Sequence, residues 1–159
     1  MMIDIVNWTK SKPSRIKIVM MLNKSITTFV YAFYPLLILY LVVQKDERLL
    51  PLLLIPAVSF ILVTVLRKRL DAKRPYQIYN YEPILTKKKD GQSFPSRHVF
   101  SIFMIAMSVF VLNTMGGVLF LILGCLLALS RVLGGVHFPS DVIAGALMGI
   151  FPWIIYWAL

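Results

Sequence analysis

Cysteine, histidine and acidic residues are scarce in this chain of 159 residues. Its single cysteine, Cys125, excludes an intramolecular disulfide. It also has only two histidines and seven aspartate and glutamate residues. A zinc or two-metal centre needs several such ligands at close spacing, and here the two histidines are separated by a predicted pair of helices. We therefore expect no metal site and no cofactor.

Hydrophobic residues are abundant instead, at 58% of the chain, which exceeds what a soluble domain of this size can bury. Five runs approach the roughly 18 to 20 residues that a helix needs to cross a bilayer. We expect an all-α integral membrane helical bundle, a single domain over residues 1–159 with about five transmembrane helices. The predicted spans are Ile26 to Val43, Leu49 to Leu66, Val99 to Met115, Gly117 to Leu133 and Val142 to Leu159.

Positive charge is in excess, with a net charge of +10, and it is concentrated in the N-terminal segment and in the loop of residues 67–97. This distribution does not form the basic face of a soluble domain, so we expect the bilayer and a lipid phosphate as partners and no nucleic acid. Residues 1–25 combine Arg15, Lys17 and Lys24 with apolar side chains. They are predicted to form an interfacial helix rather than a cleaved signal.

With five predicted crossings, three segments lie on the same side of the membrane, because two spans separate each of them from the next. These are the N-terminus, the long loop of residues 67–98 and the short loop of residues 134–141. Ser130 and Arg131 end the fourth predicted span at that same side. Lys87 to Lys89, Asp90 and Gly91 are expected to make a polar turn within the long loop. Every candidate site residue is therefore expected on one membrane face.

The two histidines suit the cleavage of a phosphate ester. A neutral His137 can attack phosphorus if a carboxylate holds its other ring nitrogen protonated, and Asp141, four residues later, is the candidate carboxylate. His98, at the expected start of the third span, can give a proton to the departing oxygen and later accept one from water. The alternative is that His137 and Asp141 form only a local hydrogen bond at a helix start.

Cations and helix amides complete the predicted site. Arginine offers forked donors that match phosphate oxygens, and the start of a helix binds anions through free backbone amides. Arginines at a bilayer edge can also simply extend toward water. The candidate phosphate-binding residues are Arg67, Arg74, Ser96, Arg97 and Arg131.

These residues resemble the three-part signature of the type 2 phosphatidic acid phosphatase family, whose core is similar to that of vanadium haloperoxidases and bacterial acid phosphatases. The third motif matches fully, as Ser130-Arg131, five residues, His137, three residues and Asp141. The resemblance covers residues 67–149, the motif-bearing core.

The other two motifs each differ from the family at one position. The family has Pro-Ser-Gly-His where this chain has Pro95-Ser96-Arg97-His98, so Arg97 either adds a cation or narrows the pocket. The first motif is Lys, six residues and Arg-Pro, and Arg67 occupies the lysine position here. Arginine keeps the charge at that position but changes its reach.

The resemblance implies metal-independent hydrolysis of a lipid phosphate through a phosphohistidine. It makes His137 the nucleophile, Asp141 its orienting partner and His98 the proton donor. Implied substrates are phosphatidic acid, phosphatidylglycerophosphate, or an isoprenoid phosphate or diphosphate. Two alternatives remain: a lipid phosphotransferase, and an inactive membrane protein that binds anionic lipid. Haloperoxidase chemistry is a weaker alternative because it needs bound vanadate.

The same family gives an expectation for location. Its membrane members typically have six spanning helices, so this chain is expected to lack the first. Many of them are similar in acting at the outer face of the plasma membrane, whereas the lysine and arginine count favours a cytoplasmic site. We expect a multi-pass protein of the cell membrane with the site at the outer face.

Overall fold

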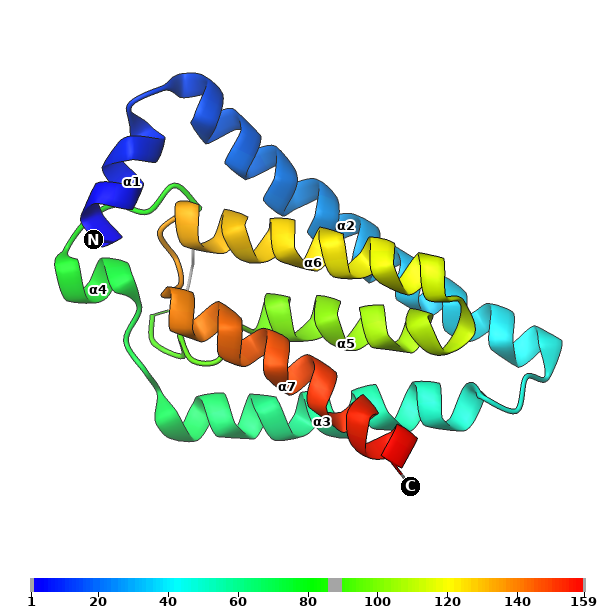
Figure 1. Cartoon of the computed structure of the whole chain (residues 1–159). Coiled ribbons are helices and arrows are strands. Elements are labelled where there is room, and N and C mark those ends of the chain that lie inside the picture. Colours follow the sequence, from blue (N-terminus) through cyan, green and yellow to red (C-terminus); the bar gives the residue numbers. More distant parts are fainter. Residues whose placement is uncertain (1, 86–89, 159) are drawn as a thin grey trace.

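The computed structural model of the chain describes residues 2–85 and 90–158, and these residues form helices and no strand (Figure 1). The three lysines of the expected polar turn, Lys87 to Lys89, lie outside the described residues. The helices are α1 (Met2–Lys10), α2 (Pro13–Gln44), α3 (Leu49–Leu70), α4 (Pro75–Tyr79), α5 (Arg97–Leu112), α6 (Thr114–Leu133) and α7 (Pro139–Ala158).

Helix α5 is the centre of the bundle. Figure 1 shows it running alongside α6 and α7, with α3 and α2 on the outside. Every residue from Val99 to Val109 is buried, because the neighbouring helices cover α5 on all sides. Phe100, Ile102 and Phe103 anchor two hydrophobic clusters that join it to these helices. The third predicted span is therefore an enclosed helix with little surface for lipid.

The outer helices carry apolar side chains toward the outside of the bundle, among them Leu36, Leu62, Leu119 and Leu147. Four of the helices are long and apolar enough to cross a membrane, and α5, with 16 residues, is a shorter apolar helix. Such a surface is suited to lipid rather than to water. The prediction of an all-helical, multi-pass membrane bundle is confirmed.

The N-terminal region differs from the prediction. Residues 1–25 are not one separate interfacial segment, because α2 starts at Pro13 and continues without a break through the first predicted span to Gln44. Proline at the first helical position favours this start, and Asn23 and Lys24 do not interrupt a helix. Only α1 remains separate, and its face of Met2, Val6 and Thr9 is buried against the rest of the chain.

The predicted gathering of the motif segments at one end of the bundle is confirmed. Figure 1 shows the start of α2, the end of α3, the start of α5, the end of α6 and the start of α7 at the same end, together with α1 and α4. The C-terminus lies at the opposite end. Which membrane face carries the motif end stays a prediction.

Two glycines fix the distance between the helices that carry the second and third motifs. A side-chain carbon at Gly145 would lie 2.6 Å from the carbonyl oxygen of Ser96, and one at Gly149 would lie 2.7 Å from that of Phe100. Small residues four positions apart let membrane helices approach closely. Helices α5 and α7 therefore pack backbone to backbone, which brings Ser96 beside the start of α7.

We expect Gly149→Ala to destabilise the protein although alanine is the better helix former by about 1 kcal/mol. The added methyl group would meet backbone atoms that cannot move aside, and such overpacking costs about 1–3 kcal/mol. The melting temperature in detergent should fall by several degrees. Gly116→Ala is the control, since its nearest neighbours are side-chain atoms of Val109 and Asn113. Equal stability of the two variants would contradict the close contact.

Candidate active site

Arg67, at the end of α3, is buried and holds the loop that leads into the second motif. Its Nη1 donates to the carbonyl oxygens of Ser93, at 3.3 Å, and Pro95, and its Nη2 donates to that of Gln92. A buried guanidinium needs such acceptors, and these come from the main chain. These hydrogen bonds hold the loop that precedes α5. A phosphate-binding role for Arg67 stays a prediction.

Arg74 joins the same loop to the third motif. Its Nε donates to the carbonyl oxygen of Gly91 at 3.0 Å, and its Nη1 donates to that of Val136 at 2.9 Å. The same Nη1 lies 3.4 Å from Nε2 of His137. Arg74 is only 3% exposed, so this charge faces the protein interior. It therefore places a cation beside the ring nitrogen that points away from Asp141.

His137 and Asp141 form the predicted pair. Nδ1 of His137 lies 3.3 Å from Oδ2 of Asp141, which also accepts from the backbone amide of Phe138 at 3.0 Å. His137 is 1% exposed and Asp141 is 3% exposed. A carboxylate in this position accepts the proton of Nδ1 and leaves the lone pair on Nε2.

Ser93 is a third member of this group, and the sequence prediction missed it. Its hydroxyl donates to Oδ2 of Asp141 and lies 3.4 Å from Nδ1 of His137. Its amide is fixed by a 2.8 Å hydrogen bond to the carbonyl oxygen of Ala72. Ser93 precedes the Pro95-Ser96 motif by two residues, and a serine in a loop gives no signal of its own. Only the folded loop reveals its partners.

Electrostatics keep His137 neutral. Burial lowers the pKa of His137 far below its usual value of 6.5, and the positive charges of Arg131 and Arg74 lower it further, while the hydrogen bond to Asp141 acts in the opposite direction. We expect burial and the two cations to dominate. The ring is then uncharged at neutral pH.

Arg131 and Ser96 are buried with polar atoms that have no partner among the described residues. Nη1 of Arg131 donates to Oδ1 of Asn23 at 2.8 Å, but its Nε and Nη2 make no hydrogen bond, and neither does the hydroxyl of Ser96. Such groups are costly to bury unless an acceptor meets them. Because α5 begins at Arg97, its first amides also lack an intrahelical acceptor. This set of donors suits an anion.

His98 and Arg97 are less buried than the other predicted site residues. His98 is half-buried in the first turn of α5, and its ring centroid is 6.3 Å from that of Tyr31 on α2. Arg97 is exposed, with its guanidinium 5.7 Å from the centre of the Phe60 ring. Of the predicted site residues, Arg67, Arg74, Ser96, Arg131, His137 and Asp141 are buried at the motif end.

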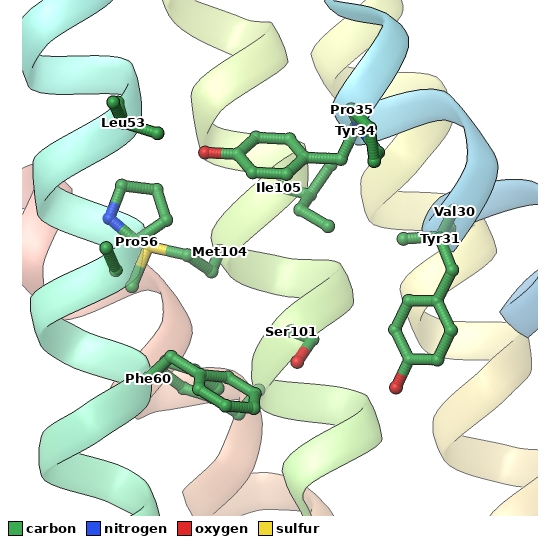
Figure 2. A pocket seen from close by; sticks show the side chains of 12 residues that line it. Val30, Tyr31, Tyr34, Pro35, Leu53, Pro56, Phe60, Ser101, Met104 and Ile105 are labelled. Atoms are coloured by element: carbon green, nitrogen blue, oxygen red, sulfur yellow. The ribbon is translucent and has the colours of Figure 1, made fainter. Parts of the chain in front are cut away.

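An apolar cavity of about 360 Å³ begins one turn below His98, between α2, α3 and α5. Figure 2 shows Tyr31 and Tyr34 on the α2 side, Phe60 and Leu53 on the α3 side, and Ser101 on α5 between them. Nearly all of its lining is apolar. It therefore offers a place for a hydrocarbon chain beside the motif end.

Two curated proteins are similar in sequence. The bacitracin transport permease protein BcrC of Bacillus licheniformis is 30% identical over 109 residues, which cover 63% of this chain and 52% of that protein. An undecaprenyl-diphosphatase of Sulfolobus acidocaldarius is 30% identical over 128 residues, or 79% of this chain and 61% of that protein. The chain thus spans about half to three fifths of the length of these relatives.

Two solved structures share the fold. LpxE of Aquifex aeolicus superposes with a TM-score of 0.66 at 24% identity, over 90% of this chain and 94% of that one. A transmembrane PAP2-type phosphatidylglycerolphosphate phosphatase of Bacillus subtilis gives a TM-score of 0.72 at 22% identity, over 92% of this chain and 77% of that one.

The family itself follows from the part of the chain that carries all three motifs. Residues 48–159, from just before α3 to the C-terminus, match the PAP2 superfamily. This match covers more than half of the chain, and the superposed structures have the same helical arrangement. The chain is a member of the PAP2 superfamily.

Proposed function

We propose that this protein hydrolyses a phosphate or diphosphate group on a membrane lipid, with His137 as the nucleophile. The observation that carries the proposal is the buried group in which Asp141 holds one ring nitrogen of His137 while Arg74 lies beside the other. A neutral, oriented imidazole next to a guanidinium has what is needed to attack a phosphoryl group.

In the proposed reaction, the lone pair of Nε2 of His137 attacks phosphorus, and the bond between phosphorus and the lipid-side oxygen breaks. That oxygen takes a proton from His98, and the phosphoryl group stays on His137. Water then attacks the phosphorus, giving its proton back to His98. The bond to Nε2 breaks, so that inorganic phosphate leaves and neutral His137 is restored.

Arg74, Arg131 and Ser96 are proposed to bind the phosphate oxygens, together with the first amides of α5. Arg131 and Ser96 have buried donors without a partner among the described residues, which supports this assignment. Charge develops on the phosphate oxygens during transfer, and donors fixed in a buried site stabilise it without reorganising. No role in this step is proposed for Arg97, because its side chain is exposed.

The substrate that we favour is an isoprenoid diphosphate. One relative, 30% identical over 79% of this chain, is an undecaprenyl-diphosphatase. The apolar cavity between α2, α3 and α5 gives a hydrocarbon chain a place near the motif end of α5 (Figure 2). In such a substrate the terminal phosphate would react and the lipid monophosphate would be the leaving group. Phosphatidic acid and phosphatidylglycerophosphate are the other candidates.

The first test is phosphate release from these lipids by the detergent-purified protein in excess chelator. We expect release to survive chelation and to fall at least about a thousandfold in His137→Ala, because the nucleophile is lost. Lys68→Ala, which removes an exposed cation next to Arg67, should leave the rate unchanged. Equal rates in His137→Ala and the wild type would refute the proposal. Phosphate recovered on an acceptor lipid would indicate a transferase.

A second test concerns the neutral state of His137. In the unfolded chain this group binds a proton below about pH 6.5, whereas in the folded protein it does so only at much lower pH. The unfolded state therefore binds more protons on acidification, and folding stability falls with falling pH, by about 2 kcal/mol between roughly pH 7.5 and 5. Melting temperatures of His137→Asn should fall less over that range. An identical fall in both proteins would contradict the buried neutral ring.

A third test concerns Ser93, which we propose as a positioning residue for Asp141 and His137. Ser93→Ala removes a hydrogen bond to a charged group, and such bonds contribute about 1.5–3 kcal/mol. We expect kcat to fall roughly tenfold to a hundredfold with little change in KM. Ser108→Ala is the matched control, since its buried hydroxyl donates to the carbonyl oxygen of Met104 within α5, away from His137 and Asp141. A raised KM with unchanged kcat would argue against positioning.

A further inference from the structure

A second cavity, of about 580 Å³, lies at the motif end, apart from His137 and Asp141. It opens between the first turns of α2, the segment at Ile84 and Leu85, and the end of α6. We call it the α2 groove. Lys17, Lys24 and Arg131 bring positive charge to its lining, and none of the described residues that line it is acidic.

Arg131 is the buried member of this set, at 3% exposure. Its Nη1 donates to Asn23 of α2, which also lines the groove, whereas its Nε and Nη2 are the donors proposed above for the substrate phosphate. Because Arg131 lines the groove, its positive charge still adds to the attraction for an anion there.

Lys17 and Lys24 are seven residues apart on α2, and both are exposed. Two helical turns separate them, so they lie along one side of the helix. Met20 lies between them and also lines the groove. The lining is therefore amphiphilic, with two flexible cations at its rim and one buried cation at its end.

The depth of the groove follows from the length of α2. Its 32 residues extend about 48 Å, whereas the hydrocarbon core is about 30 Å thick. The apolar stretch of residues 26–43 is long enough to fill that core, so the part of α2 before Ser25 reaches the headgroup region. Lipid phosphates lie at this depth.

We propose that the α2 groove binds the phosphate headgroup of an anionic phospholipid from the surrounding bilayer. The cations would hold the phosphate, and Met20 and Leu85 would contact the glycerol and the first methylene groups. Free phosphate would leave that apolar lining exposed to water. The proposal goes beyond hydrolysis, since neither His137 nor Asp141 lines the groove and the groove would bind lipid in a protein without activity.

The test compares lipid binding by the full-length protein in detergent, through native mass spectrometry and thermal stabilisation. Phosphatidylglycerol should bind and raise the melting temperature, and phosphatidylcholine should do neither. Near a membrane surface each lysine contributes about 1 kcal/mol to binding an anionic lipid, so the double variant K17Q/K24Q should bind phosphatidylglycerol roughly thirtyfold more weakly.

The double variant K10Q/K12Q is the matched control. It removes the same charge from the same end of the chain, at positions that do not line the groove. It should retain wild-type affinity, and K17R/K24R should retain most of it. Equal loss in K10Q/K12Q would overturn the proposal in favour of general surface attraction. Stabilisation by inorganic phosphate that matches that by phosphatidylglycerol would overturn it in favour of a free-anion site.

Because both readouts measure binding, they do not depend on catalysis. If the active enzyme does not prefer phosphatidylglycerol to phosphatidylcholine, the proposed lipid site is refuted and the proposed hydrolase remains. Conversely, a protein that releases no phosphate but binds phosphatidylglycerol through Lys17 and Lys24 would refute the hydrolase and retain the groove.

Discussion

The burial of arginine at the motif end is the constraint on which the rest of the site depends. A guanidinium that leaves water must find acceptors, and Arg67 and Arg74 find them in main-chain carbonyl groups between Gly91 and Pro95. The hydrogen bonds thus fix a loop that has no regular structure of its own. That loop carries Ser93 against Asp141 and leads directly into Ser96. Arg67 and Arg74, the arginines of the first motif, therefore hold this loop in place in addition to bringing positive charge to the site.

Packing in the membrane core complements this polar scaffold. Gly145 and Gly149 allow α7 to approach the backbone of α5, and the amide of Ser96 donates to the carbonyl oxygen of Asp141 at 2.9 Å. The second and third motifs are consequently locked together at their helix starts. Any shift between α5 and α7 would separate Ser96 from the His137–Asp141 pair. Apolar contacts along the helices thus determine polar geometry at their ends.

Much of this arrangement was predictable from the sequence. Hydropathy predicted five helical runs. The first two motifs lie in one loop and two runs separate that loop from the third motif, which placed all three motifs at one end. The spacing of His137 and Asp141 predicted their contact. Sequence could not reveal Ser93, because its role arises from a loop folded around buried arginines. The sequence prediction also placed the start of α2 too late, at Ile26 instead of Pro13, because hydropathy marks where a helix meets lipid and not where the helix begins.

The buried arginines differ in how many of their N–H donors are hydrogen-bonded to the protein, and this difference distinguishes the roles proposed for them. Arg67 donates to three carbonyl groups, so few of its donors remain for a ligand. Within the described part of the chain Arg131 has one hydrogen-bond partner and two unpartnered nitrogens, although it is as deeply buried as Arg74. The cost of burying a cation without acceptors is tolerated where binding an anion removes it. Arg131 is accordingly the arginine for which a bound phosphate would relieve the largest cost of burial, in keeping with the role proposed for it.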